Sequence, residues 1–208
     1  MSSDTTIQAI IYGNPVGFAG EQVIYSYGNA QYPQQPLSVL SLNSEYVFAL
    51  RIQSNGVLYS LIFNSNNLFS YCSDPDGNGR PKALLQIHLF VPRDYILPDP
   101  YKALMDLKNY FYANAMRQMG INSYQYAVER LTDSIKSGLD NIIIQYQNAL
   151  QRRGNKVYRP TSVKPDAKIL TLQYDESAIR QLLQDVHYPE FAPYKYVVLG
   201  NNINNPQS

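Results

Sequence analysis

The strongest constraint on this chain is a switch in the spacing of its apolar residues at Pro98-Asp99-Pro100. Before this point, short runs rich in Val, Ile, Leu, Tyr and Phe alternate with polar residues or are continuously apolar, which is typical of β-strands. After it, apolar residues recur every three or four positions, as in amphipathic helices. This order predicts an α+β fold whose N-terminal part is a largely antiparallel sheet. The expected strands cover residues 6–12, 22–27, 45–52, 57–63 and 83–91.

Two local signals refine the expected sheet. Ser54-Asn55-Gly56 separates two apolar runs, and Asn-Gly is a strong hairpin signal because both residues tolerate positive φ. The run 83–91 is almost continuously apolar, which favours a central strand covered on both faces. The sequence therefore predicts a hairpin at residues 54–56 and places His88 inside the sheet.

The second half of the chain predicts two helices. Asp99 is a suitable N-cap and Pro100 suits the first helical position. The first helix is expected to run to Gly120, with Leu107 and Phe111 packing it against core residues Leu85, Ile87 and Leu89. The second is expected from Asn122 or Ser123 to Arg152-Arg153-Gly154. A bend is expected at Gly138, because glycine costs about 1 kcal/mol relative to alanine inside a helix.

The last part of the chain has the pattern of a βαβ unit. A strand is expected at 168–173, a short helix capped by Asp175 follows, and a final strand covers 194–199. We expect residues 1–200 to form a single α+β domain. Residues 201–208 are polar and rich in Asn, which favours a flexible tail or the start of a linker. We expect the chain to be the N-terminal part of a longer protein.

Charge and cysteine content limit the expected environment and partners. Lys and Arg total 17 and Asp and Glu total 16, so the chain lacks the basic excess of a dedicated nucleic-acid binder. No apolar run approaches the length of a transmembrane helix, and the first residues do not resemble a secretory signal. The single cysteine, Cys72, forms no internal disulfide and fits a reducing compartment. We expect a cytoplasmic protein that binds neither nucleic acid nor membranes.

The chain has 19 Tyr and no Trp, together with many Asn and Gln residues. Tyrosine provides a large contact area at low entropic cost and keeps a polar tip. The alternative is that most tyrosines pack at the borders of the sheet and helices. The composition is compatible with an uncharged surface that recognises a protein partner.

Three parts of the sequence contain residues that could form a metal, anion-binding or catalytic site. Asp74-Pro-Asp-Gly-Asn-Gly79 begins like a calcium loop, but Leu85 stands where the bidentate carboxylate is required, so a tight turn without metal is expected. The glycine-rich loop Gly13–Gly20 could approach an anion, although its spacing matches no nucleotide-binding motif. Cys72 with His88 is a weak nucleophile–base pair, because a lone histidine in a strand is more often a hydrogen-bonded core residue. We expect no catalytic residues and no cofactor.

A further pattern links the glycine-rich loop to the later strand. Tyr12-Gly13, Gly17-Phe18 and Gly79-Arg80-Pro81 precede a strand that contains His88-Leu-Phe. Residues 8–91 thereby resemble the N-terminal domains of bacterial GTPase-associated proteins of signalling or conflict systems. The resemblance implies an interaction or adaptor role with no established catalysis.

The sequence thus favours a non-enzymatic protein-interaction or adaptor module of a larger intracellular regulatory protein. The alternative is a small-ligand or nucleotide-binding domain, or an enzyme, whose cleft is formed by the Gly13–Gly20 loop, Arg80 and His88. Its expected ligand-binding residues are Gly13, Gly17, Gly20, Arg80 and His88. The two interpretations differ in whether these residues converge on one pocket.

Overall fold

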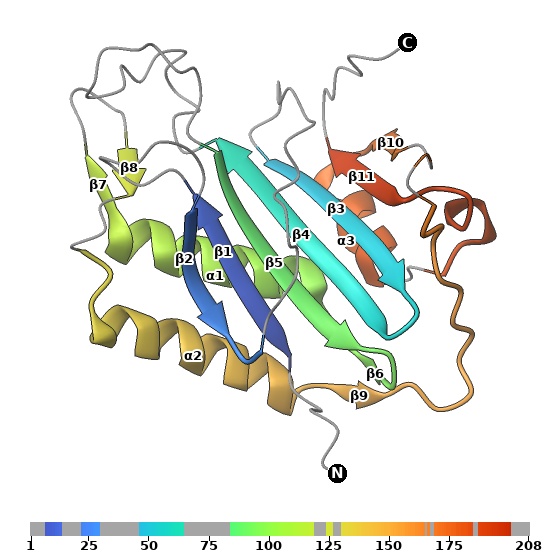
Figure 1. Ribbon diagram of the computed structural model, residues 1–208, viewed down its shortest axis with the longest axis horizontal. Coiled ribbons are helices and arrows are strands. Elements are labelled where there is room, and N and C mark those ends of the chain that lie inside the picture. Colours follow the sequence, from blue (N-terminus) through green and yellow to red (C-terminus); the bar gives the residue numbers. More distant parts are fainter. Residues whose placement is uncertain are drawn as a thin grey trace.

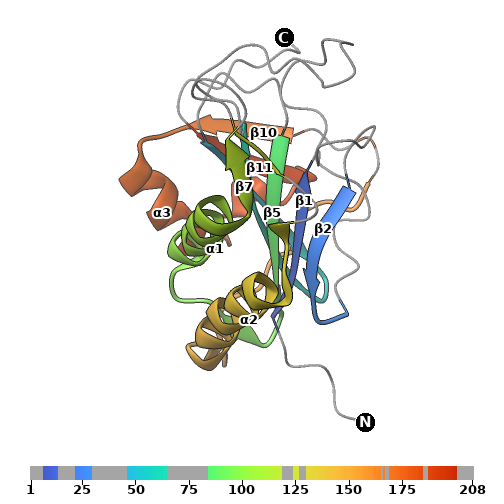
Figure 2. The ribbon, with the colours of Figure 1, turned by 90° about the vertical axis from the view of Figure 1, so that its left-hand side faces the viewer.

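The computed structural model forms a large sheet with helices packed on one of its faces (Figures 1 and 2). It describes residues 7–13, 22–29, 46–64, 84–118, 124–126, 130–164, 166, 169–184 and 187–200. The sheet has seven strands in the order β10-β11-β3-β4-β5-β1-β2. Its strands are β1 (Gln8–Gly13), β2 (Gln22–Tyr27), β3 (Tyr46–Gln53), β4 (Gly56–Asn64), β5 (Leu84–Pro92), β10 (Ile169–Gln173) and β11 (Tyr196–Gly200).

The pairing of the strands confirms the predicted α+β class. Neighbouring strands are antiparallel except β10 and β11, which are parallel and connected through α3 (Glu176–Gln184). A parallel pair needs such a crossover, because a tight turn can only join antiparallel strands. The chain therefore ends in the predicted βαβ-like unit, and β5 lies inside the sheet between β4 and β1.

The β3–β4 hairpin forms where the sequence predicts it, but Gly56 has a different role. Gln53 pairs with Gly56, so the two loop residues are Ser54 and Asn55 and the glycine is the first residue of β4. A Cβ atom at Gly56 would lie 2.4 Å from the Phe90 ring and from the Val91 carbonyl oxygen. Glycine is therefore required at this position for the close approach of β5.

Helices α1 (Pro100–Ala115), α2 (Asp133–Asn148) and α3 cover the same face of the sheet (Figure 2). The predicted caps are present: the Asp99 carboxylate accepts from the Lys102 backbone N–H at 3.0 Å, and that of Asp175 accepts from the Ala178 N–H at 2.8 Å. Phe111 is completely buried, as predicted, in the core cluster between the helices and the sheet. The cluster includes Leu107, Leu85, Ile87 and Leu89.

The prediction was wrong about residues 116–118, 124–126 and 130–132, which it assigned to the two helices. The chain leaves α1 after Ala115, and β7 (Met116–Gln118) pairs with β8 (Tyr124–Tyr126). Helix α2 begins only at Asp133, because Thr132 is extended and its side chain caps the helix by accepting from the Ile135 backbone N–H. Strand pairing and a strong local cap together override the apolar spacing of this segment.

Helix α2 continues through Gly138 as one element rather than two helices. A Cβ atom at Gly138 would lie 1.9 Å from the Tyr110 hydroxyl oxygen and 2.2 Å from the adjacent ring carbon. The glycine thus allows α2 to pack closely on α1. The helix also ends earlier than predicted, at Asn148, and β9 (Gln151–Arg152) then pairs with β6 (Tyr95–Ile96).

Both faces of the sheet carry buried apolar side chains. The helix-side core is the larger one, and Val47, Ala49, Ile62 and Val198 form a second buried cluster. A 3-10 turn, η2 (Pro189–Phe191), connects α3 toward β11 and buries Phe191 in the helix-side core. None of the helices in the described part of the chain is long and apolar enough to cross a membrane.

Candidate functional site

The structure describes two of the five predicted ligand-binding residues. Gly13 ends β1, and the space that a Cβ atom would occupy there is filled by Ile24 and Leu85, at 2.6 Å and 2.9 Å. Both of those neighbours belong to the helix-side core. Gly17, Gly20 and Arg80 lie outside the described residues, so the predicted cleft as a whole stays a prediction.

His88 lies on the opposite face of β5 from Leu85, Ile87 and Leu89, the strand residues that face the helices. Its Nδ1 atom is 2.7 Å from the Ser60 hydroxyl, which pairs with it across the β4–β5 ladder. Its Nε2 atom has no hydrogen-bond partner, and the ring meets Tyr12 edge-on. Burial lowers the pKa of His88 to about 3, so the imidazole is neutral at neutral pH.

The Ser60–His88 pair has the donor–acceptor distance of a nucleophile and its base. Both side chains are only 1% exposed, however, and no carboxylate among the described residues orients the free nitrogen of His88. This arrangement favours the core-histidine alternative over catalysis. Cys72, the candidate nucleophile, and Asp74–Gly79, the candidate calcium loop, lie outside the described residues.

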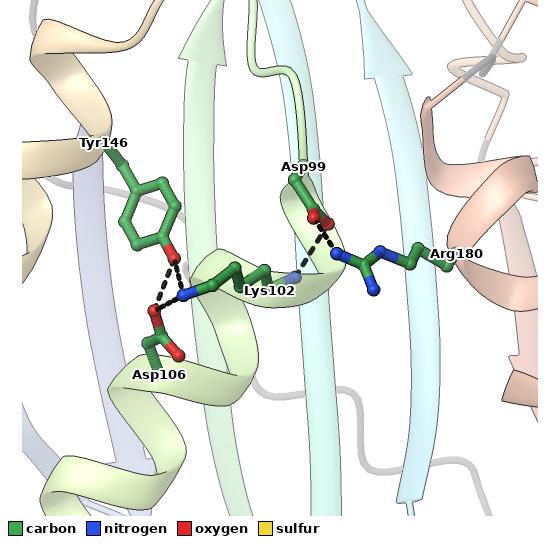
Figure 3. A network of polar contacts seen from close by, with 5 residues as sticks. All are labelled: Asp99, Lys102, Asp106, Tyr146 and Arg180. Carbon is green, nitrogen blue, oxygen red and sulfur yellow. Dashed lines mark hydrogen bonds and ion pairs between the residues drawn. The ribbon is translucent and has the colours of Figure 1, made fainter. Parts of the chain in front are cut away.

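Figure 3 shows a network of charged and polar groups on the helical side. Lys102 and Tyr146 both donate to the Asp106 carboxylate, at 2.6 Å and 2.5 Å, which connects α1 to α2. Arg180 of α3 donates to Asp99, the residue that caps α1. Because each charge in this network has an opposite partner, its role is to hold the three helices together.

A different region combines a cavity with positive charges that form no ion pair with a described carboxylate. A cleft of about 480 Å³ opens beside β4, β6, the C-terminal end of α3 and the segment that follows β9. We call it the basic cleft, because its lining includes Arg153, Lys156, Arg159 and His187. The other lining residues are Tyr59, Ile96, Val157 and Gln184.

Arg153 is the anchored residue of the basic cleft. It is 8% exposed, and its Nε and Nη2 atoms donate to the backbone carbonyls of Arg93 and Tyr95, at 2.8 Å and 3.1 Å. Its guanidinium also lies 4.9 Å from the centre of the Tyr158 ring. Gly154, with φ of 58°, turns the chain immediately afterwards, in a conformation that favours glycine. The guanidinium is therefore held rigidly by β6 and the β5–β6 turn.

His187 is the third partner of this guanidinium. Nη1 of Arg153 donates to Nε2 of His187 at 2.7 Å, and the backbone N–H of Arg159 points to Nδ1 at 3.3 Å. The imidazole also contacts the Tyr158 ring, at 5.1 Å between centroids. Arginine can only donate, so Nε2 must be an acceptor. Protonation of His187 would remove this acceptor and place a second positive charge beside Arg153.

Tyr59 contributes a neutral donor to the basic cleft. The residue is 3% exposed, and its hydroxyl forms no hydrogen bond with any described residue. Burial raises the pKa of Tyr59, and the neighbouring Arg153 opposes this only in part. The phenol therefore keeps its proton at neutral pH and can donate it to a bound group.

The charge of the basic cleft is not neutralised by the described part of the protein. Arg153, Lys156 and Arg159 form no ion pair with a described carboxylate, and no described carboxylate lines the cleft; the Asp94 carboxylate attracts Arg153 only from beyond ion-pair distance. Gln184 is the last residue of α3, and the end of a helix carries roughly half a negative charge, which offsets only part of three positive charges. Chemically, the site is suited to binding an anion.

Sequence reasoning missed this cleft. Arg152, Arg153, Lys156 and Arg159 lie within one short segment that contains no acidic residue, which is a detectable signal for an anion site. The segment was instead interpreted as the end of a helix. Its partners could not be found from spacing, because Arg93 and Tyr95 are 60 and 58 residues away in the sequence.

The described residues do not suggest a metal centre. No group of three or more His, Cys, Asp or Glu side chains among them is arranged to hold a metal ion.

No protein-family model, curated protein or solved structure matches this chain. The basic cleft, by its geometry and charge, is the candidate functional site of the described residues.

Proposed function

We propose that this chain is a non-catalytic recognition module that binds an anionic group of its partner in the basic cleft. The observation that carries the proposal is the Arg153 guanidinium, which is buried and charged and forms no ion pair with a described carboxylate. A buried charge without a counter-charge is unfavourable, and a bound anion would compensate it. Its hydrogen bonds to backbone carbonyls keep it in place without neutralising it.

The donors available in the cleft support the same function. Arg153 uses three of its five N–H groups in the hydrogen bonds described above, and two remain for a ligand. Tyr59, whose hydroxyl forms no hydrogen bond with a described residue, lines the same cleft. Two N–H groups on one guanidinium suit the paired oxygens of a carboxylate or phosphate.

The non-catalytic part of the proposal follows from where the reactive groups lie. The cleft lining combines cations and neutral donors with no nucleophile–base pair. Ser60 and His88, which do have that geometry, are buried on the face of the sheet opposite Tyr59. A protein partner that carries the anionic group fits the interaction role expected from the sequence.

Isothermal titration calorimetry with inorganic phosphate, at constant ionic strength, tests the proposal. The double variant Lys156→Gln/Arg159→Gln removes two cations of the cleft, and we expect it to weaken binding about tenfold or more, as for lost charged hydrogen bonds. The matched control Arg152→Gln/Lys164→Gln removes the same charge from exposed positions outside the lining, and should bind within about threefold of the wild type. Equal losses in both variants, or no phosphate binding to the wild type, would contradict the proposal.

A further inference from the structure

We infer that the anion bound in the basic cleft is a phosphate monoester in its dianionic form. This inference rests on the proposed function and adds the chemical class of the ligand. A carboxylate or a sulfate ester carries a single negative charge, whereas a phosphate monoester carries close to two at neutral pH. The choice between them follows from the charge, the donors and the size of the cleft.

The positive charge of the basic cleft favours a dianionic ligand. Arg153, Lys156 and Arg159 contribute three positive charges, and the end of α3 offsets roughly half of one. Arg153 is buried, whereas Lys156 and Arg159 are exposed at the rim of the cleft, and a monoanion would leave most of their combined charge uncompensated. A dianion compensates most of it, and the attraction grows in proportion to the ligand's charge.

The number of hydrogen-bond donors in the basic cleft also favours a phosphate monoester. The unused N–H groups of Arg153 and the hydroxyl of Tyr59 provide three donors from two rigidly held side chains. Lys156 and Arg159 add further donors at the cleft. Two carboxylate oxygens would leave part of this set unused, whereas the three terminal oxygens of a phosphate ester can accept from all of it.

The cleft is larger and less polar than a bare phosphate ion requires. Its volume of about 480 Å³ lies within the range of roughly 300–1,000 Å³ that is common for sites of organic ligands. Ile96 and Val157 provide apolar lining, and Gln184 provides an amide. These residues fit the organic part of an ester, with the phosphate at Arg153.

The dianion requirement gives a characteristic pH dependence. The second pKa of a phosphate ester is about 6, so the dianion, and with it the affinity, increases from pH 5 to pH 7.5. A protein group that gains a proton at low pH adds positive charge and acts in the opposite direction on any anion. A sulfate ester stays a monoanion over this range, so its binding reports only on the protein.

The ionisable side chains around the basic cleft do not reverse the comparison between the phosphate ester and the sulfate ester. Among the described residues, the titratable and charged side chains that line the cleft or act on Arg153 are Lys156, Arg159, His187, Tyr59, Tyr158, Arg93 and Asp94. Burial raises the pKa of Tyr158 to about 12 and raises that of Tyr59, so both phenols keep their protons between pH 5 and pH 7.5. A protein group that gains or loses a proton affects the phosphate and the sulfate ester in the same direction, because both ligands are anions.

The experiment compares phenyl phosphate with phenyl sulfate, which has the same shape and one charge fewer. We expect phenyl phosphate to bind at least tenfold more tightly at pH 7.5, and the ratio of the two affinities to approach one at pH 5.

A phosphotyrosine-containing tripeptide serves as a third probe: tighter binding than phenyl phosphate identifies a phosphorylated protein as the source, and weaker binding identifies a free ester. Arg153→Lys keeps the charge without the fork, so it should weaken the binding of both esters and leave the phosphate-to-sulfate ratio close to that of the wild type.

The outcomes separate the inference from the proposed function. Equal binding of both esters at pH 7.5 would overturn the dianion inference and leave the anion-binding function standing. Binding of neither ester would overturn both. A ratio that stays constant from pH 5 to pH 7.5 would also contradict the inference, because the second ionisation of the phosphate would then have no effect.

Discussion

The buried histidine of β5 predicts a specific loss of stability at acidic pH. Burial lowers the pKa of His88 to about 3 in the folded protein, whereas an unfolded histidine titrates near 6.5. Between these two values the unfolded chain binds the proton more readily, so the free energy of unfolding decreases as the pH falls below about 6.5. From pH 7.5 to pH 5 the loss spans roughly 1.5 pKa units, which corresponds to about 2 kcal/mol.

The assay is urea unfolding at pH 7.5 and pH 5, with His88→Gln as the reference. Glutamine does not titrate and can still bond Ser60, so the difference between the two proteins isolates the contribution of His88. We expect the wild type to lose about 2 kcal/mol more than the variant between the two pH values, with unchanged m-values. Parallel losses in both proteins would refute the reasoning, because His88 would then titrate alike in the folded and unfolded states.

Further predictions concern the helical layer. Phe111→Ala should cost about 3–5 kcal/mol of unfolding free energy in urea, because the ring is completely buried in the core; a cost below about 1 kcal/mol would argue against this packing. Gly138→Ala should lower the melting temperature despite alanine's higher helix propensity, because the new Cβ atom meets the end of the Tyr110 side chain; a rise would show that the Tyr110 side chain can move aside. Tyr146→Phe should cost about 1 kcal/mol through its lost hydrogen bond to Asp106, and Asp106→Asn in the same background should then cost less than it does alone.

The parts of the fold that sequence predicted well depend on local chemistry. The strands of the first half, the caps Asp99 and Asp175, and the parallel strands around α3 all follow from side-chain spacing or from one residue bonding a backbone N–H nearby. The packing of Phe111 follows from the same helical spacing. These features need little information from distant parts of the chain.

The parts that sequence reasoning missed depend on distant partners. Gly56 is needed because β5 approaches it, and Gly138 because Tyr110 does, so neither role can be recognised from the neighbouring residues. Strand β9 forms because Tyr95 and Ile96 pair with it across the chain, where the local pattern indicated a helix end. The basic cleft has the same origin, since Arg153 is positioned by carbonyl groups far away in the sequence.

The most direct test of the anion-binding function is to observe the Arg153 guanidinium itself by NMR. Its Nε–H donates to the Arg93 carbonyl, which should slow its exchange with water and make its ¹H–¹⁵N signal observable. On titration with phenyl phosphate at pH 7.5, we predict saturable shifts of this signal and of the backbone amides of Gly154 and Arg159. A titration that leaves the Arg153 signal unchanged, while shifts centre on the Lys102–Asp106–Tyr146 network or on the His88 face of the sheet, would contradict the assignment of the basic cleft as the functional site.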